Sequence, residues 1–156
     1  MKISDLLNSS NVLTKLSVKS KKEAIDKLVK ALSHDLDEKT LASVRKAVME
    51  RENIMSTGVG KGLAIPHGKS GDIDRTYAAF AILEEPVEYE AIDNEPVHIL
   101  FLLVGPESQN SIHIKMLSRI SRLLNSATFR DKLLSNDDSE SIIELFQSEE
   151  KHFIRA

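Results

Sequence analysis

The sequence contains no cysteine among its 156 residues. This excludes a disulfide framework, a thiolate metal site and a cysteine nucleophile within the chain. No apolar run approaches the roughly 20 residues that are needed to span a bilayer. The N-terminal stretch carries Asp5 and lacks the apolar region of a signal peptide. We therefore expect a cytoplasmic protein with no direct membrane insertion.

The chain also lacks a basic excess. Its 21 Lys and Arg residues are outnumbered by 24 Asp and Glu residues, which gives a formal net charge of -3 and no electrostatic footprint for nucleic acid. Hydrophobic residues at 41% and charged residues at 29% describe an ordinary globular protein. We expect a single domain over residues 1–156 that does not bind nucleic acid.

The spacing of apolar residues predicts helices in pairs, separated by short strands. The expected helical segments cover residues 3–7 (a short turn), 20–36, 38–51, 111–125, 127–134 and 139–149. The expected strands cover residues 12–18, 76–83, 87–89 and 97–104. The last of these is the most hydrophobic run of the chain, so it should be a central strand.

One connection decides the type of sheet. Glu84-Glu85-Pro86 is expected to break the strand 76–83 and to lead into a short edge strand. These two strands are joined too tightly for a crossover helix, which favours a mixed sheet over a purely parallel one. We therefore predict an α/β fold with a mixed central β-sheet flanked by α-helices on both faces. Ser20, with Glu23 three residues later, is expected to cap the helix over residues 20–36.

The most distinctive stretch reads R-E-N-I-M-S-T-G-V-G-K-G-L-A-I-P-H-G-K, residues 51–69. Its alternating glycines suit a backbone that turns sharply or lies close to a ligand, and we expect a loop that leaves the second helix. Pro66 fixes one dihedral and holds the preceding residue extended, and Gly68 leaves the other flank free of a side chain. The pattern predicts that His67 is presented on a stiff turn as a reactive imidazole.

Generic motifs fail on this stretch. The phosphate-binding loop G-x-x-x-x-G-K-[ST] and the dinucleotide fingerprint G-x-G-x-x-G both require glycine where Leu63 stands. No pair of histidines has short metal-ligand spacing, and the hydrolase elbow G-x-S-x-G is absent. We therefore expect histidine chemistry with no metal and no cofactor.

A neutral imidazole, with an ordinary pKa of about 6.5, can act as acid, base or nucleophile near neutral pH. Attack of His67 on phosphorus would leave a phosphohistidine, and that chemistry needs positive charge and hydrogen-bond donors around the phosphoryl oxygens. Candidates near His67 in the sequence could supply charge, hydroxyls, backbone amides or a close approach for a partner: Arg51, Ser56, Thr57, Gly58, Gly60 and Gly68.

The segment S-T-G-V-G-K-G-L-A-I-P-H-G resembles the active-site signature of phosphotransferase-system enzyme IIA domains of the fructose/mannitol type, a family that includes the nitrogen-regulatory IIA proteins. Three later features fall where that family has comparable ones: A-I-D-N-E-P-V before an apolar strand, Gly105-Pro106, and the helix opening H-I-K-M-L. The resemblance spans nearly the whole chain, and it implies a mixed sheet between helices.

The resemblance also implies roles for individual residues. His67 would receive a phosphoryl group on Nε2 from the histidine carrier protein HPr and pass it to a cysteine of a sugar-specific IIB domain. His113 matches a second histidine beside the first, and Arg51 matches an arginine that stabilises the phosphate. Without the resemblance, His113 is a histidine in a first helical turn, where the helix dipole disfavours a cation, and Arg51 complements the C-terminal end of its helix.

Other charged or titratable residues carry weaker interpretations. His98 lies inside an apolar strand and is expected to be a packing residue, whereas Lys61 and Lys69 either guide an acidic partner or are solvated surface charges.

Several functions stay open beside the phosphocarrier in sugar transport. A regulatory IIA would use the phosphorylation state of His67 to control binding to partner proteins, and the absence of an attached IIB or IIC segment favours it. A non-catalytic module would use the glycine loop as an anion site. A hydrolase using His67 and His113 is a weaker alternative, because the sequence offers no evident carboxylate to orient the imidazole.

Overall fold

The most hydrophobic run of the chain forms the central strand β6, Val97–Pro106. β5 (Tyr77–Val87) pairs with it in antiparallel orientation, while β3 (Leu63–Ala64) and β4 (His67–Ser70) pair with it in parallel orientation. β1 (Val12–Leu16) lies parallel to β5, and β2 (Gly58–Gly60) lies antiparallel to β3. The predicted mixed sheet is confirmed.

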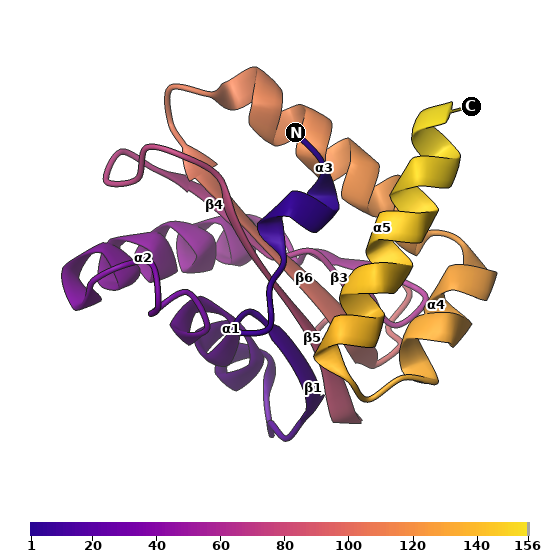
Figure 1. Ribbon diagram of the computed structural model, residues 1–156. Helices are drawn as coiled ribbons and strands as arrows, with labels where there is room; N and C mark the ends of the chain where they lie inside the picture. Colours follow the sequence, from indigo (N-terminus) through magenta and orange to yellow (C-terminus); the bar gives the residue numbers. More distant parts are fainter. Residues whose placement is uncertain (156) are drawn as a thin grey trace.

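The computed structural model describes residues 1–155, and within them helices cover both faces of the open sheet (Figure 1). The helices are η1 (a 3-10 turn, Ile3–Leu6), α1 (Lys21–Lys30), α2 (Glu38–Ile54), α3 (Asn110–Leu124), α4 (Ala127–Leu134) and α5 (Ser139–Arg155). None of the helices in this described part is long and apolar enough to cross a membrane.

Side chains of β6 alternate between two separate cores, which explains why the strand is apolar throughout. Leu100, Leu102 and Val104 pack into the core beneath α1 and α2. Ile99, Phe101 and Leu103 pack into the core beneath η1, α3, α4 and α5. Figure 1 shows the two groups of helices on opposite sides of the sheet.

Local signals set most helix ends correctly. The Ser20 hydroxyl accepts a hydrogen bond from the Glu23 amide at 3.1 Å and caps α1 as predicted. α4 has the predicted bounds, 127–134. α1 ends earlier than predicted, at Lys30, whereas α2 and α5 end later, at Ile54 and Arg155.

The predicted break at Glu84-Glu85-Pro86 is wrong, since β5 continues to Val87 with an irregular register after Ile82. The pairing of β5 with β1 ends at Leu83. Beyond that residue β5 pairs with no strand on its outer side among residues 1–155, and a proline there removes no ladder hydrogen bond. Pro86 is therefore compatible with a continuous strand.

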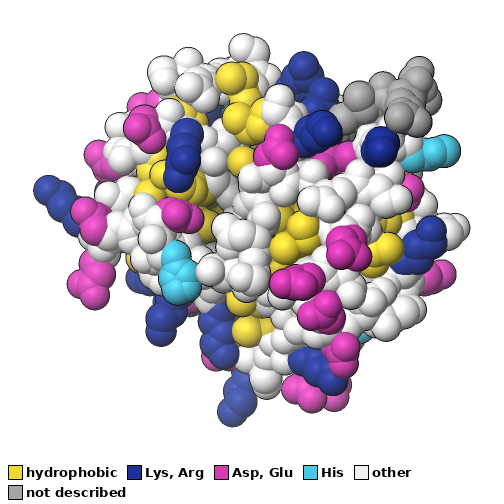
Figure 2. Space-filling view, in the orientation of Figure 1, with side chains coloured by type: hydrophobic (Ala, Val, Ile, Leu, Met, Phe, Trp, Pro, Cys, Tyr) yellow, Lys and Arg dark blue, Asp and Glu magenta, His cyan; other side chains and the backbone are white. Residues whose placement is uncertain are grey.

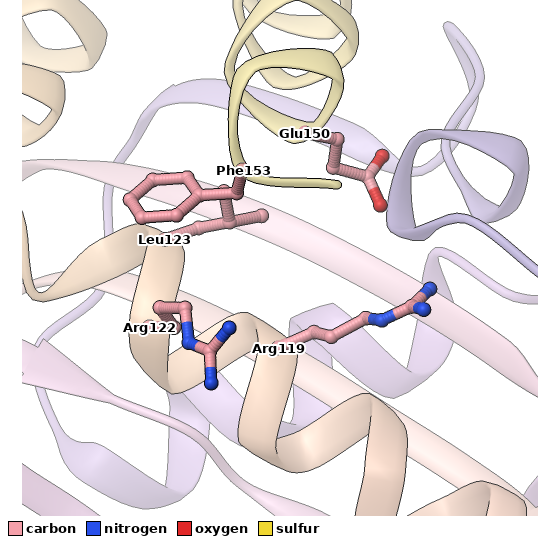
Figure 3. A pocket seen from close by; sticks show the side chains of 5 residues that line it. All are labelled: Arg119, Arg122, Leu123, Glu150 and Phe153. Atoms are coloured by element: carbon pink, nitrogen blue, oxygen red, sulfur yellow. The ribbon is translucent and has the colours of Figure 1, made fainter. Parts of the chain in front are cut away.

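The N-terminal segment is held by a buried carboxylate on α5. Glu150 is 3% exposed and accepts hydrogen bonds from the backbone amides of Ile3 and Ser4, the latter at 2.7 Å. Arg119 of α3 donates to the Met1 carbonyl at 2.7 Å. A hollow of about 240 Å³ lies beside these contacts. Figure 3 shows the side chains that line it: Arg119, Arg122, Leu123, Glu150 and Phe153.

Candidate functional site

His67 is the first residue of β4, not part of a turn as predicted. It pairs with Leu103 of β6, and the preceding Pro66 carbonyl accepts a hydrogen bond from the Leu103 amide at 3.0 Å. Gly68 is needed because a Cβ there would lie 3.0 Å from the backbone nitrogen of Val48 in α2. The strand therefore holds His67 against both β6 and α2.

The His67 ring is held in one tautomer. Its Nδ1 lies 2.8 Å from the backbone carbonyl oxygen of Ile65. A carbonyl oxygen can only accept a hydrogen bond, so Nδ1 carries the proton and Nε2 keeps its lone pair in the neutral ring. Burial lowers the pKa of His67, and the charge of Arg51 lowers it further, while the Ile65 hydrogen bond and the charge of Glu52 act against them. The imidazole is neutral at pH 7.

His113 lies in the first turn of α3, and its ring centroid is 5.8 Å from that of His67. Its side chain is buried, at 4% exposure. Burial lowers the pKa of His113 to about 4, with smaller effects from the charges of His67 and Lys69. The lowered pKa agrees with a neutral imidazole, with burial and not the helix dipole as the main cause. Among the described residues, neither its Nδ1 nor the nearby buried hydroxyl of Thr76 has a hydrogen-bond partner.

Arg51 complements the end of its helix and also lies at the hollows beside His67. It lies in the last turn of α2, and its Nη1 donates to the Met55 carbonyl at 2.9 Å, so it does complement the end of the helix. It also lines both hollows that His67 lines, and its charge lowers the pKa of His67. The cation is therefore close enough to influence whatever binds at His67.

Two hollows meet at His67 and share Arg51 and Leu117. The first, of about 680 Å³, is also lined by Ser56, Thr57 and Gly58. The second, of about 530 Å³, is also lined by Gly68, Lys69, Asn110 and His113. Of the residues predicted to surround the reacting group, only Gly60 lines neither hollow.

The glycine stretch forms a small hairpin, β2–β3, and not a free loop. Ser56 donates to the Tyr89 carbonyl and accepts from the Gly58 amide. A Cβ on Gly58 would lie 2.7 Å from that of Ala91, so this glycine permits close packing against the segment that precedes β6. The Thr57 amide and hydroxyl both donate to Glu52. These donors face the protein interior, which leaves the predicted anion nest without them.

The rim of the first hollow is apolar and exposed. Met55, Val59 and Ile92 are 69%, 51% and 82% exposed, and Ile114 beside the second hollow is 58% exposed. On the face drawn in Figure 2, side chains of both charge signs are interspersed between hydrophobic patches. Exposed apolar residues that gather at one rim typically mark an interaction surface.

Glu52 is the residue that the sequence analysis missed. It is 5% exposed and accepts hydrogen bonds from the Thr57 amide at 2.7 Å and the Tyr89 hydroxyl at 3.1 Å, and it pairs with Lys21 at 2.9 Å. Burial alone would raise the pKa of this carboxyl, but the Thr57 and Lys21 contacts outweigh burial and lower it. The missed signal was its position on α2: Glu52 follows Val44 and Val48 at helical spacing and therefore lies on the same buried face.

A family model identifies the family to which the chain belongs. The model of the phosphoenolpyruvate-dependent sugar phosphotransferase system, EIIA 2, matches residues 5–149. The chain therefore belongs to this family, and the resemblance in its sequence is confirmed. The family is one of phosphotransfer components.

Individual relatives fall into a regulatory and a sugar-transport group. The chain is 37% identical over 142 residues to a nitrogen regulatory protein of Bradyrhizobium diazoefficiens, covering 91% of this chain and 92% of that protein. It is 32% identical to the fructose-specific EIIABC component of Bacillus subtilis, covering 97% of this chain but only 24% of that longer protein. The crystal structure of nitrogen regulatory protein IIA-Ntr from Neisseria meningitidis is 29% identical, with a TM-score of 0.85 over 92% of this chain and 98% of that one.

Proposed function

We propose that the protein is a phosphocarrier whose His67 accepts a phosphoryl group from the phosphohistidine of HPr and passes it to a downstream acceptor. One observation carries the proposal: the Ile65 carbonyl accepts a hydrogen bond from Nδ1 of the half-buried imidazole of His67, which leaves the lone pair on Nε2. A neutral nucleophile of defined tautomer is what attack on phosphorus requires.

The transfer balances without a proton acceptor. The Nε2 lone pair of His67 forms the new N–P bond, and the bond between phosphorus and the donor imidazole breaks with its electron pair returning to that ring. Nδ1 of His67 keeps its proton and its hydrogen bond to Ile65 while the ring takes on positive charge. Passing the group on repeats the step in reverse, to a IIB cysteine thiolate in the transport version.

Arg51 and His113 would support the transferred group electrostatically. Arg51 supplies a fixed positive charge for the phosphoryl oxygens. His113, kept neutral by burial, has one ring N–H that can donate without competing with His67 for positive charge. Ser56, Thr57, Gly58 and Gly68 act as the supporting wall of the hollows, with their own donors already used or packed inside.

The apolar rim suits a protein donor better than a small one. A partner that docks over Met55, Val59 and Ile92 would bring its own histidine to the hollow while excluding water. Such encounters between carriers are transient and use small interfaces.

A second candidate is a regulatory protein in which the phosphorylation state of His67 controls binding to other proteins. The observation that favours it is the 37% identity to a nitrogen regulatory protein over nearly the full length of both chains. The chemistry at His67 is the same in both versions, and only the acceptor differs.

Intact mass spectrometry after incubation with phosphoenolpyruvate, enzyme I and HPr tests the proposal. We expect one added phosphoryl group on wild type, none on His67→Ala, and slower addition on His113→Ala and Arg51→Ala. His98→Ala, a change of the same kind on β6 outside the hollows, is the matched control and should be phosphorylated like wild type. No mass gain on wild type would refute the carrier and leave the non-catalytic anion-binding module.

A further inference from the structure

A buried carboxylate lies behind His67, and the phosphocarrier mechanism above does not use it. Glu52 belongs to α2, one residue after Arg51, and its charge acts on the pKa of His67. Among the described residues, no hydrogen bond joins its carboxylate to the imidazole. The connection between the two side chains runs instead through the backbone of the glycine hairpin.

We infer that Glu52 is a positioning residue for His67, acting through the backbones of Thr57 and Ile65 to fix the tautomer of the imidazole. The expected effect of Glu52 on phosphoryl transfer rests on the proposed function, whereas its expected effect on the His67 tautomer does not.

Three successive hydrogen bonds make the connection. The Thr57 amide donates to Glu52 Oε2 at 2.7 Å. The Ile65 amide donates to the Thr57 carbonyl at 3.0 Å. The Ile65 carbonyl accepts from His67 Nδ1 at 2.8 Å. Thr57 and Ile65 are each held at both their amide and their carbonyl, so Glu52 sets where the last carbonyl lies.

The connection is one of position and not of electronic relay. The amide and the carbonyl of one residue belong to different peptide groups, so polarisation does not pass through Thr57 by resonance. Glu52 instead acts by fixing the positions of the backbone atoms of Thr57 and Ile65. Glu52, Thr57 and Ile65 are 5%, 4% and 4% exposed, so water does not compete for these hydrogen bonds and a displaced partner is costly to leave unpaired.

Lys21 makes Glu52 a rigid anchor. Its ammonium lies 2.9 Å from Glu52 Oε2 and 4.7 Å from the centre of the Tyr89 ring, whose hydroxyl donates to the same carboxylate. Residues from α1, α2 and the segment before β6 thus converge on one carboxylate. Glu52 is thus a buried carboxylate that the sequence did not reveal, and its link to the imidazole runs through the backbone.

Other charged or titratable groups also surround His67. The charge of Arg51 of α2 lowers the pKa of His67, the ring of His113 of α3 lies beside it, and Lys69 of β4 acts on His113. The charge of Glu52 raises the pKa of His67, so removing that charge while keeping the hydrogen bond should lower this pKa and leave the tautomer intact.

Two substitutions at Glu52 distinguish position from charge. Glu52→Asp keeps the charge but withdraws the carboxylate by one methylene from the Thr57 amide. Glu52→Gln keeps the reach and an acceptor oxygen but removes the charge. We expect Glu52→Asp to lose the preference for the Nδ1–H tautomer in imidazole ¹⁵N NMR spectra and to accept phosphoryl at least tenfold more slowly. We expect Glu52→Gln to keep the tautomer and a rate within about threefold of wild type, with a lower His67 pKa.

Glu50→Asp is the matched control, since Glu50 is an exposed glutamate of the same helix, and it should change neither readout. Spectra are recorded well below the Tm of each variant, so that a loss of stability alone does not move the tautomer ratio. An unchanged tautomer in Glu52→Asp, or a larger effect in Glu52→Gln than in Glu52→Asp, would overturn the inference. Because NMR needs no phosphate donor, failure of phosphorylation in wild type would refute the proposed function without touching the tautomer result.

Discussion

Replacing Gly68 by alanine should destabilise the protein through the packing of β4 on α2. A Cβ at this position would lie 3.0 Å from the Val48 nitrogen, 3.1 Å from the Ala47 carbonyl carbon and 3.2 Å from the Val48 Cα. All three are backbone atoms of a helix, which cannot rotate away as a side chain could. Overpacking of this kind costs about 1–3 kcal/mol, whereas the entropy that alanine removes from the unfolded chain returns about 0.4–1 kcal/mol. Strain therefore wins.

Thermal unfolding measures the outcome. At about 2–4 °C per kcal/mol for a chain of this size, strain of that magnitude lowers Tm by roughly 2–12 °C before the entropy gain is subtracted. Gly71→Ala is the matched control, because its Cβ would meet only the end of the Glu107 side chain, at 3.5 Å, and no left-handed φ is required there. A Gly68→Ala variant that melts at or above the wild-type Tm would refute the account of why a glycine follows His67.

Three further outcomes are expected. The free energy of unfolding should fall as pH drops from 6.5 towards the folded pKa of His113, at about 4, because the unfolded state binds the proton more readily. The loss reaches ~3 kcal/mol at its limit. Chemical denaturation at a series of pH values should show a smaller loss in His113→Gln than in wild type. The rate of phosphoryl acceptance should stay flat from pH 8 to 6.5 and fall only below that, since burial lowers the pKa of His67 and protonation occupies Nε2. Mass spectra of samples quenched at successive times measure this rate, and a decline that begins above pH 6.5 would contradict the prediction. Ile92→Asp should weaken HPr-dependent phosphorylation at least fivefold with little change in Tm, whereas Leu134→Asp, an exposed apolar residue of α4, should leave the rate unchanged.

The sequence predicted well whatever depends on neighbours along the chain. Helix α4 and the Ser20 cap follow from spacing and capping within a few residues, and both were correct. The apolar run at 97–104 identified the central strand because a strand buried on both faces needs no polar alternation. These are local properties, so one sequence is enough to read them.

Pairings between distant segments were not readable in the same way. His67 was expected in a turn because Pro66 and Gly68 flank it. It lies instead in a strand and pairs with Leu103 of β6, a pairing that no local sequence pattern predicts. The glycines were assigned to an anion nest, whereas Gly58 makes room for Ala91. Glycine permits a close approach without saying whether a ligand or the protein's own backbone makes it.

Glu52 illustrates a signal that was present in the sequence but was not used. A glutamate in register with Val44 and Val48 on one helix face points into the core, and a buried carboxylate must have partners. The register predicts burial, but only the fold reveals that Lys21, Thr57 and Tyr89 are those partners.

The topology explains why the two histidines meet. β4 runs parallel to β6 and places His67 opposite Leu103, near the carboxyl end of β6, and α3 begins just after that end with His113 in its first turn. Ligands of open α/β sheets bind outside the carboxyl ends of strands, where helix N-termini favour negative charge. We expect a phosphoryl group on His67 to be favoured there by the charge of Arg51 and by the dipole of α3. A cation at His113 is opposed by burial and by the charges of His67 and Lys69. In the proposed transfer, two neutral imidazoles would leave the positive charge of Arg51 available to the phosphoryl oxygens.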